Sequence, residues 1–202
     1  MRLSKILLSA AVVLSCGCGM IAEERFDPAS VEPVIYTETV PLKRIKDDVQ
    51  LYPEVQDASV FVPVTLKESV RLFSEKGTGI VVYSEEDCLW CQKAMPVLAE
   101  ALRLTQVNAY HVDTAGKIKP EDYDTLCGYI SDIFLPDPDS DTTSFYIPAV
   151  IAVKDGVITA HHISLTEDYD PEEAEELSEE QYLKLLQTYT ELIGTLGPQS
   201  EE

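Results

Sequence analysis

Basic residues are scarce in this chain of 202 residues, which has 15 Lys and Arg against 36 Asp and Glu. The formal charge of -21 repels phosphate backbones and anionic lipid headgroups, so we expect no nucleic-acid partner and no charge-driven membrane contact. Five Cys are too few for a disulfide-built miniprotein, and nine Gly with twelve Pro are too few for a collagen-like or low-complexity chain. The hydrophobic residues, 45% of the total, must therefore supply the core of one globular domain.

An apolar run of membrane-spanning length is also missing. Residues 1–15 have a basic start and then an apolar stretch of about half the ~20 residues that a spanning helix needs. This pattern predicts a signal peptide and a protein that works outside the cytoplasm. Cys16, directly after the run, resembles the lipidated residue of bacterial lipoproteins, with Cys18 as the alternative. We therefore expect cleavage before Cys16 and a membrane anchor consisting only of lipid; without the lipid, the protein would be secreted or periplasmic.

The rest of the chain divides by its patterning. Residues 16–57 are rich in Pro and charge and lack periodicity, which predicts a tether, and residues 198–202 read as a disordered tail. Residues 58–197 alternate between β-branched runs and helical spacing, which predicts an α/β domain. The expected strands cover residues 60–64, 79–83, 107–112, 149–153 and 157–163, and the expected helices begin near residues 66, 88, 120 and 178.

Two cysteines stand where a buried strand gives way to a helix, in the sequence Cys88-Leu89-Trp90-Cys91. The spacing brings both sulfurs onto one helical turn, while the first stays at the exposed helix end. Backbone N–H groups and the helix dipole at that end favour a thiolate, the form that attacks disulfides. The pattern indicates Cys88 as the nucleophile and Cys91 as the more buried thiol that resolves the mixed disulfide.

Four features in this order resemble the thioredoxin family over about residues 58–197. They are the Cys88-Leu89-Trp90-Cys91 motif, Pro96, Ile147-Pro148 ahead of an apolar strand, and the hairpin Lys154-Asp155-Gly156. The resemblance implies a thioredoxin-like fold, with a central mixed β-sheet flanked by helices, preceded here by an N-terminal extension. It implies an extracytoplasmic thiol–disulfide oxidoreductase with no cofactor beyond the redox-active disulfide Cys88–Cys91.

The resemblance also implies how substrates bind. Pro148 is similar to the family's cis-proline, which leaves the backbone of Ile147 free to pair with an extended substrate segment. Trp90 would add an apolar contact surface, or else simply pack at the helix start. The expected partners are proteins or peptides with cysteines, together with a redox partner protein.

This sequence departs from the family pattern in two ways, and acidic residues before the motif add a third effect. Val82 stands where many thioredoxins carry a buried Asp that helps proton transfer, so resolution is slower here or another group such as Glu86 assists. The intervening pair Leu-Trp differs from the pairs of well-known subfamilies. Glu85, Glu86 and Asp87 precede Cys88 and oppose thiolate formation. The direction of electron flow therefore stays open.

A narrower resemblance suggests the kind of client. The segments Val62-Pro63-Val64-Thr65 and 147–156 are similar to small thioredoxin-like accessory proteins found with bacteriocin export. This implies dedicated exported clients. The alternative function is a non-catalytic binding or accessory module that keeps the fold and holds a secreted peptide or an export system.

The sequence gives weaker support to a metal site that includes the same two cysteines. Cys88 and Cys91 with His161 and His162 contain the residue types of a zinc site, but adjacent residues on a strand point to opposite faces. We therefore expect no metal and read the two His as an ordinary strand end.

Three remaining sequence patterns have structural interpretations that require no site. Asp137, Asp139 and Asp141 match the opening of a calcium loop whose later positions do not fit, which favours a solvated loop. Cys127 lies on an apolar helical stripe, which favours a small buried thiol over a redox role. Nine of the fourteen residues in 167–180 are acidic, which indicates a solvated insertion or a docking surface for a basic partner.

Overall fold

The computed structural model describes residues 25–46, 52, 54–116, 118–138 and 140–198. The expected signal peptide, the candidate lipidation residues Cys16 and Cys18, Asp139 and most of the expected C-terminal tail lie outside these residues. Among the helices of the described residues, none has both the length and the apolar character needed to cross a membrane.

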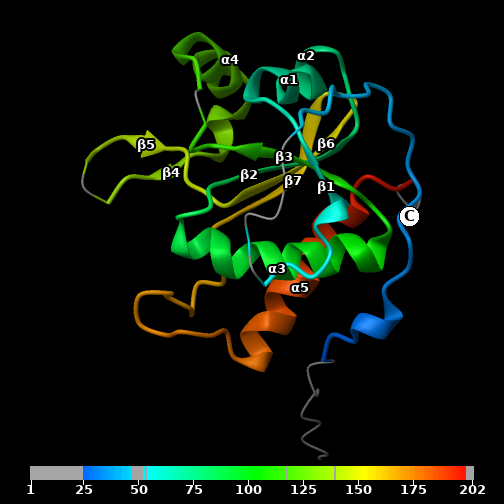
Figure 1. Ribbon diagram of the computed structural model, residues 1–202, viewed down its shortest axis with the longest axis vertical. Helices are drawn as coiled ribbons and strands as arrows, with labels where there is room; N and C mark the ends of the chain where they lie inside the picture. Colours follow the sequence, from blue (N-terminus) through cyan, green and yellow to red (C-terminus); the bar gives the residue numbers. More distant parts are fainter. Residues whose placement is uncertain (1–24, 47–51, 53, 117, 139, 199–202) are drawn as a thin grey trace, which may run out of the picture.

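A five-stranded mixed sheet forms the centre of the molecule (Figure 1). Its strands lie in the order β1-β3-β2-β6-β7; β1, β3 and β2 are parallel, and β6 runs antiparallel to both β2 and β7. The strands are β1 (Phe61–Pro63), β2 (Gly79–Ser84), β3 (Ala109–Asp113), β6 (Ala149–Lys154) and β7 (Val157–Ile163). A separate short hairpin pairs β4 (Leu135–Pro136) with β5 (Thr143–Ser144).

Helices cover both faces of this sheet (Figure 1). The long helices α3 (Leu89–Thr105) and α5 (Glu179–Gly194) pack together on one face. The other face is covered by α1 (Leu66–Ser69), α2 (Arg71–Ser74) and α4 (Pro120–Ile130). Three 3-10 turns complete the described elements: Pro28–Ser30, Ala58–Val60 and Ser131–Ile133. The prediction of an α/β chain with a mixed sheet flanked by helices is confirmed.

The central strand β2 contributes side chains to two separate cores, one on each face of the sheet. All six of its residues are buried, as expected for a strand whose two faces are both covered. Because successive side chains point to opposite faces, Ile80 and Val82 join the core under α3 and α5, whereas Val81 and Tyr83 join the core under the short helices. The apolar run that predicted this strand therefore also predicted its central position.

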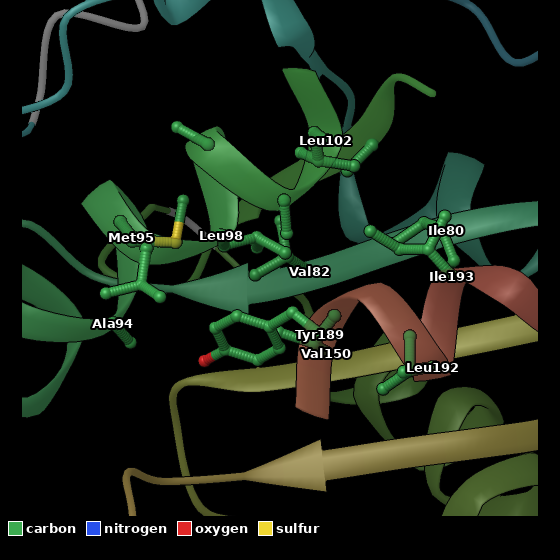
Figure 2. Packing of buried hydrophobic residues seen from close by; sticks show 14 of the residues in the cluster. Ile80, Val82, Ala94, Met95, Leu98, Leu102, Val150, Tyr189, Leu192 and Ile193 are labelled. Carbon is green, nitrogen blue, oxygen red and sulfur yellow. The ribbon is translucent and has the colours of Figure 1, made fainter. Parts of the chain in front are cut away.

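The core beside α3 and α5 is built from buried apolar side chains of both helices and the sheet (Figure 2). Met95 and Leu98 of α3 and Tyr189 and Ile193 of α5 belong to one core, and all four side chains are almost completely excluded from solvent. Burial of each such side chain is worth about 1.5–3 kcal/mol, so this interface fixes α3, which carries the two cysteines, against the sheet.

The segment before the sheet differs from the free tether that its composition predicts. Val40 and Leu42 are buried in the core beside the short helices, and Tyr52 is buried in the core beside α3. The backbone N–H of Ile45 donates to the carbonyl of Pro63 in the edge strand β1 at 2.9 Å. The described part of this segment thus packs on the domain. Single apolar residues spaced along an irregular path make these contacts, and such contacts leave no periodic pattern to detect.

Candidate active site

The first cysteine stands at the junction of β2 and α3. The loop after Ser84 turns through three acidic residues, and the backbone N–H of Cys88 donates to the carbonyl of Glu85 at 3.3 Å. Cys88 is the N-cap of α3, with extended backbone angles, and its sulfur accepts a hydrogen bond from the backbone N–H of Cys91 at 3.2 Å. A sulfur thus occupies the capping position that a Ser or Asp side chain usually fills.

This position lowers the pKa of the Cys88 thiol to about 7. The largest cause is a hydrogen bond from the Cys91 side chain, and backbone N–H groups of Cys91 and Trp90 add to it. Partial burial and the charge of Glu85 act in the opposite direction. The expectation that acidic residues before the motif oppose thiolate formation is therefore confirmed for Glu85, and the hydrogen bonds outweigh it.

The second cysteine has the opposite environment. Cys91 is fully buried in the core beside α3, whereas Cys88 is half-buried at its edge. The hydrogen bond that the Cys91 thiol donates to Cys88 is the largest cause that raises its pKa, and burial raises it further. Cys88 and Cys91 are both free thiols in this structure. One group is thus poised to ionise near neutrality while its neighbour keeps its proton.

A distant segment completes the site. The peptide bond between Ile147 and Pro148 is cis, and the carbonyl oxygen of Ile147 lies 4.0 Å from the sulfur of Cys88. The side chains of Trp90 and Ile147 are half-buried and pack against the same core. Leu89, in contrast, is 46% exposed and offers apolar surface beside the sulfur. The structure therefore brings all the expected site residues of the domain together, while Cys16 lies outside the described residues.

A buried chain of polar side chains near this site was not found by the sequence reasoning. The phenol of Tyr52 donates to Ser84 Oγ at 2.8 Å, and Ser84 Oγ lies 2.8 Å from Nε2 of His111. His111 could have been noticed as the polar residue of an otherwise apolar strand. Tyr52 lies in a segment without periodicity, and nothing in the sequence marks it.

The weaker candidate sites are placed apart. His161 is exposed, while His162 points inward and its ring meets that of Tyr189 edge-on, with centroids 5.6 Å apart. The two rings thus point to different faces, as expected for neighbours on a strand. Cys127 is half-buried on α4, and burial raises the pKa of its thiol. In the described part of the chain, no three His, Cys, Asp or Glu side chains are grouped so that they could hold a metal ion.

The pair of thiols can form one disulfide by losing two electrons and two protons. An accessible thiolate is a competent nucleophile, and a buried thiol beside it is placed to displace whatever the nucleophile has bound. Glu86, the residue suggested as a helper, is exposed, and its backbone carbonyl accepts a hydrogen bond from the side chain of Gln92 at 2.9 Å. No protein-family model matches this chain, and no curated protein matches it either.

Proposed function

We propose that this protein is a thiol–disulfide oxidoreductase with a thioredoxin-like fold, acting through a Cys88/Cys91 dithiol–disulfide couple. The observation that carries the proposal is the sulfur of Cys88 at the N-cap of α3, with a pKa near 7 and a buried cysteine hydrogen-bonded to it. At pH 7 about half of such a thiol is ionised, against a few per cent of an ordinary thiol.

The reaction divides into two exchanges. In the reducing direction, the Cys88 thiolate attacks one sulfur of a client disulfide, forming a mixed disulfide and releasing the other client sulfur as a thiolate. Cys91 then loses its proton and attacks Cys88, which forms the Cys88–Cys91 disulfide and releases the second client thiolate. The client gains two electrons, and the two cysteines lose them. Oxidation of a client runs through the same steps in reverse.

The surroundings of Cys88 support a polypeptide as the substrate. The sulfur lies beside the backbone of Ile147 at the cis bond, where an extended segment would pair, and the exposed side chain of Leu89 offers an apolar contact. An electron donor or acceptor protein would use the same surface. The narrower sequence resemblance favours exported peptides as clients.

Catalysed reduction of insulin by dithiothreitol tests the activity. We expect the wild-type protein to accelerate precipitation of the insulin B chain and Cys88→Ser to give the uncatalysed rate. Cys127→Ser is the matched control, because Cys127 is a half-buried thiol outside the site, and its rate should equal that of the wild type. Equal rates for wild type and Cys88→Ser would overturn the proposal and favour a binding module.

Trapping identifies the clients. Removal of the resolving thiol in Cys91→Ser should leave mixed disulfides on Cys88 that withstand alkylation and dissociate in reductant. Recovery of the same partners from the Cys88→Ser variant would show that they bind without exchanging disulfides.

We also propose that the protein acts outside the cytoplasm. An N-terminal lipid on Cys16 would hold the domain outside the cytoplasm, where disulfides form and exchange. Metabolic labelling with a fatty acid, compared between Cys16→Ala and Cys18→Ala, tests the residue. Loss of label only in Cys18→Ala would move the anchor to Cys18, and unlabelled wild-type protein would exclude the lipid.

A further inference from the structure

The turn that leads into Cys88 is made of three consecutive acidic residues, Glu85, Glu86 and Asp87. Its two ends are joined by the hydrogen bond from the backbone N–H of Cys88 to the carbonyl of Glu85, at 3.3 Å. Like charges on neighbouring residues repel one another and favour an open loop over a tight turn. A turn of this composition therefore depends on contacts with other parts of the chain.

The start of the turn is held by two segments that are distant in the sequence. Ser84, the last residue of β2, accepts a hydrogen bond on its Oγ from the phenol of Tyr52 at 2.8 Å. The carbonyl of Ser84 accepts two more from Thr114, one from the backbone N–H at 2.9 Å and one from Oγ1 at 3.2 Å. Ser84 and Tyr52 are both buried. The residue before Glu85 is thus fixed through both its side chain and its backbone.

The middle of the turn is tied to helix α3. The side chain of Gln92 donates through Nε2 to the carbonyl of Glu86 at 2.9 Å. The backbone N–H of the same residue donates to the carbonyl of Cys88 at 3.0 Å. Gln92 therefore links the turn to the beginning of the helix that Cys88 caps.

The environment of the Cys88 sulfur depends on the backbone conformation of its own residue. Cys88 has a φ of -79° and a ψ of 115°, and in this conformation its sulfur accepts the backbone N–H of Cys91 at 3.2 Å. If the turn opened, Cys88 would be free to leave the capping position, and its sulfur would lose this donor. The other titratable groups that act on the pKa of Cys88 are the Cys91 thiol and the carboxylate of Glu85.

We propose that Tyr52, Thr114 and Gln92 are positioning residues, which hold the acidic turn so that Cys88 stays at the N-cap of α3 with its sulfur on the N–H of Cys91. Each acts through Ser84 or Glu86. The consequence for catalysis rests on the proposed function: a weaker hold lowers the thiolate fraction of Cys88 and slows its attack on a client disulfide. Because Tyr52 belongs to the segment before the domain, this segment takes part in building the site.

The pH dependence of Cys88 alkylation tests the proposal without any client. Reaction of the reduced protein with iodoacetamide at several pH values, followed by mass mapping, gives the midpoint for Cys88. We expect Tyr52→Phe, Thr114→Val and Gln92→Ala each to raise this midpoint by about 0.5 of a pH unit, as expected when one hydrogen bond to a thiolate is weakened. A merely structural role would change the stability of the fold and leave the midpoint in place.

Matched variants serve as controls. Tyr83→Phe removes the hydroxyl of another buried tyrosine with a serine partner, Ser69, on the opposite face of the sheet. Gln187→Ala removes a helical glutamine whose Nε2 donates to Glu191 of α5 at 2.8 Å. Both should keep the wild-type midpoint. Thr114→Ser keeps the hydroxyl group and should restore the midpoint that Thr114→Val loses.

The outcomes separate the positioning role from the proposed function. Unchanged midpoints in the three variants would overturn the positioning role, whatever the insulin assay shows. A midpoint in Tyr83→Phe that rises as much as in Tyr52→Phe would also overturn it, because the shift would then follow any loss of stability. A wild-type protein that is alkylated with a midpoint near pH 7 but does not reduce insulin would overturn the redox function alone. If Tyr52→Phe fails to fold by circular dichroism, Thr114→Val and Gln92→Ala decide the matter.

Discussion

The sulfur of Cys88 lies 4.0 Å from the carbonyl oxygen of Ile147, although 58 residues separate them in the chain. The contact joins the start of α3 to the segment that leads into β6. β2 and β6 are antiparallel neighbours in the sheet, so the end of β2 lies beside the start of β6. Sheet topology therefore brings the sulfur and the cis bond together.

Alkylation of Cys88 should follow a titration near neutral pH. With the pKa lowered to about 7, the thiolate fraction rises with pH, so the rate should be half-maximal near pH 7 and level off above about pH 8. Cys127, whose pKa is raised by burial, should stay slow over this range. Reaction with iodoacetamide, followed by mass mapping, measures both rates. A midpoint near that of an ordinary thiol would contradict the expected hydrogen bonding at the helix start.

Removal of the charge of Glu85 should shift the same titration of Cys88. This carboxylate raises the pKa of Cys88, so Glu85→Gln should move the midpoint of alkylation to lower pH by a few tenths of a unit, as expected for a partly screened charge. Glu86→Gln is the control, because Glu86 is exposed. A shift to higher pH in Glu85→Gln would show that Glu85 stabilises the thiolate.

Patterns within single segments were enough to predict much of this molecule. The apolar run at 79–83 predicts the buried strand β2, and the spacing of Ser178 and Gln181 is typical of the capping box that begins α5. Pro63 is typical of an edge strand or a bulge, and β1 is the edge of the sheet. Such features depend on neighbours in the sequence, which is why the sequence reveals them.

Contacts between distant residues escaped the same reasoning. Tyr52 meets Ser84 and His111 across the core, and none of the three has a local pattern that predicts the others. One short helix was expected to begin near residue 66 and to end before Gly77, but the structure has two helical turns, α1 and α2. Ser69 at this break donates its hydroxyl to the carbonyl of Leu66 at 2.8 Å, which competes with regular helical bonding.

The buried part of the N-terminal segment can be tested by truncating single side chains. Leu42→Ala should lower the free energy of unfolding by about 2–4 kcal/mol, because Leu42 is buried against the short helices. Ile35→Ala is the matched control: Ile35 is 81% exposed, so the change should stay within about 0.5 kcal/mol. Urea denaturation measures both. If Leu42→Ala changed the free energy of unfolding as little as Ile35→Ala is expected to, the segment would be a free tether.

The turn between β6 and β7 should require glycine. Gly156 has a φ of +80°, and a Cβ there would lie 2.7 Å from the carbonyl oxygen of Phe73 and 2.9 Å from Cα of Lys76. Both atoms belong to backbone, so Gly156→Ala should destabilise the protein by about 2 kcal/mol or more. Gly128→Ala, in α4 with nothing within 4 Å, should instead stabilise it by about 0.5–1 kcal/mol. Thermal unfolding of both variants checks the opposite signs.

Two buried tyrosines should respond differently to loss of their hydroxyl groups. Tyr83 Oη lies 3.0 Å from Ser69 Oγ, so Tyr83→Phe should cost about 1 kcal/mol of stability. Tyr189 Oη is buried with no hydrogen-bond partner among the described residues, so Tyr189→Phe should be neutral or stabilise the fold by up to about 1 kcal/mol. Denaturant unfolding at one pH compares the two variants directly. A cost for Tyr189→Phe as large as that for Tyr83→Phe would mean that its hydroxyl is satisfied, for example by an ordered water.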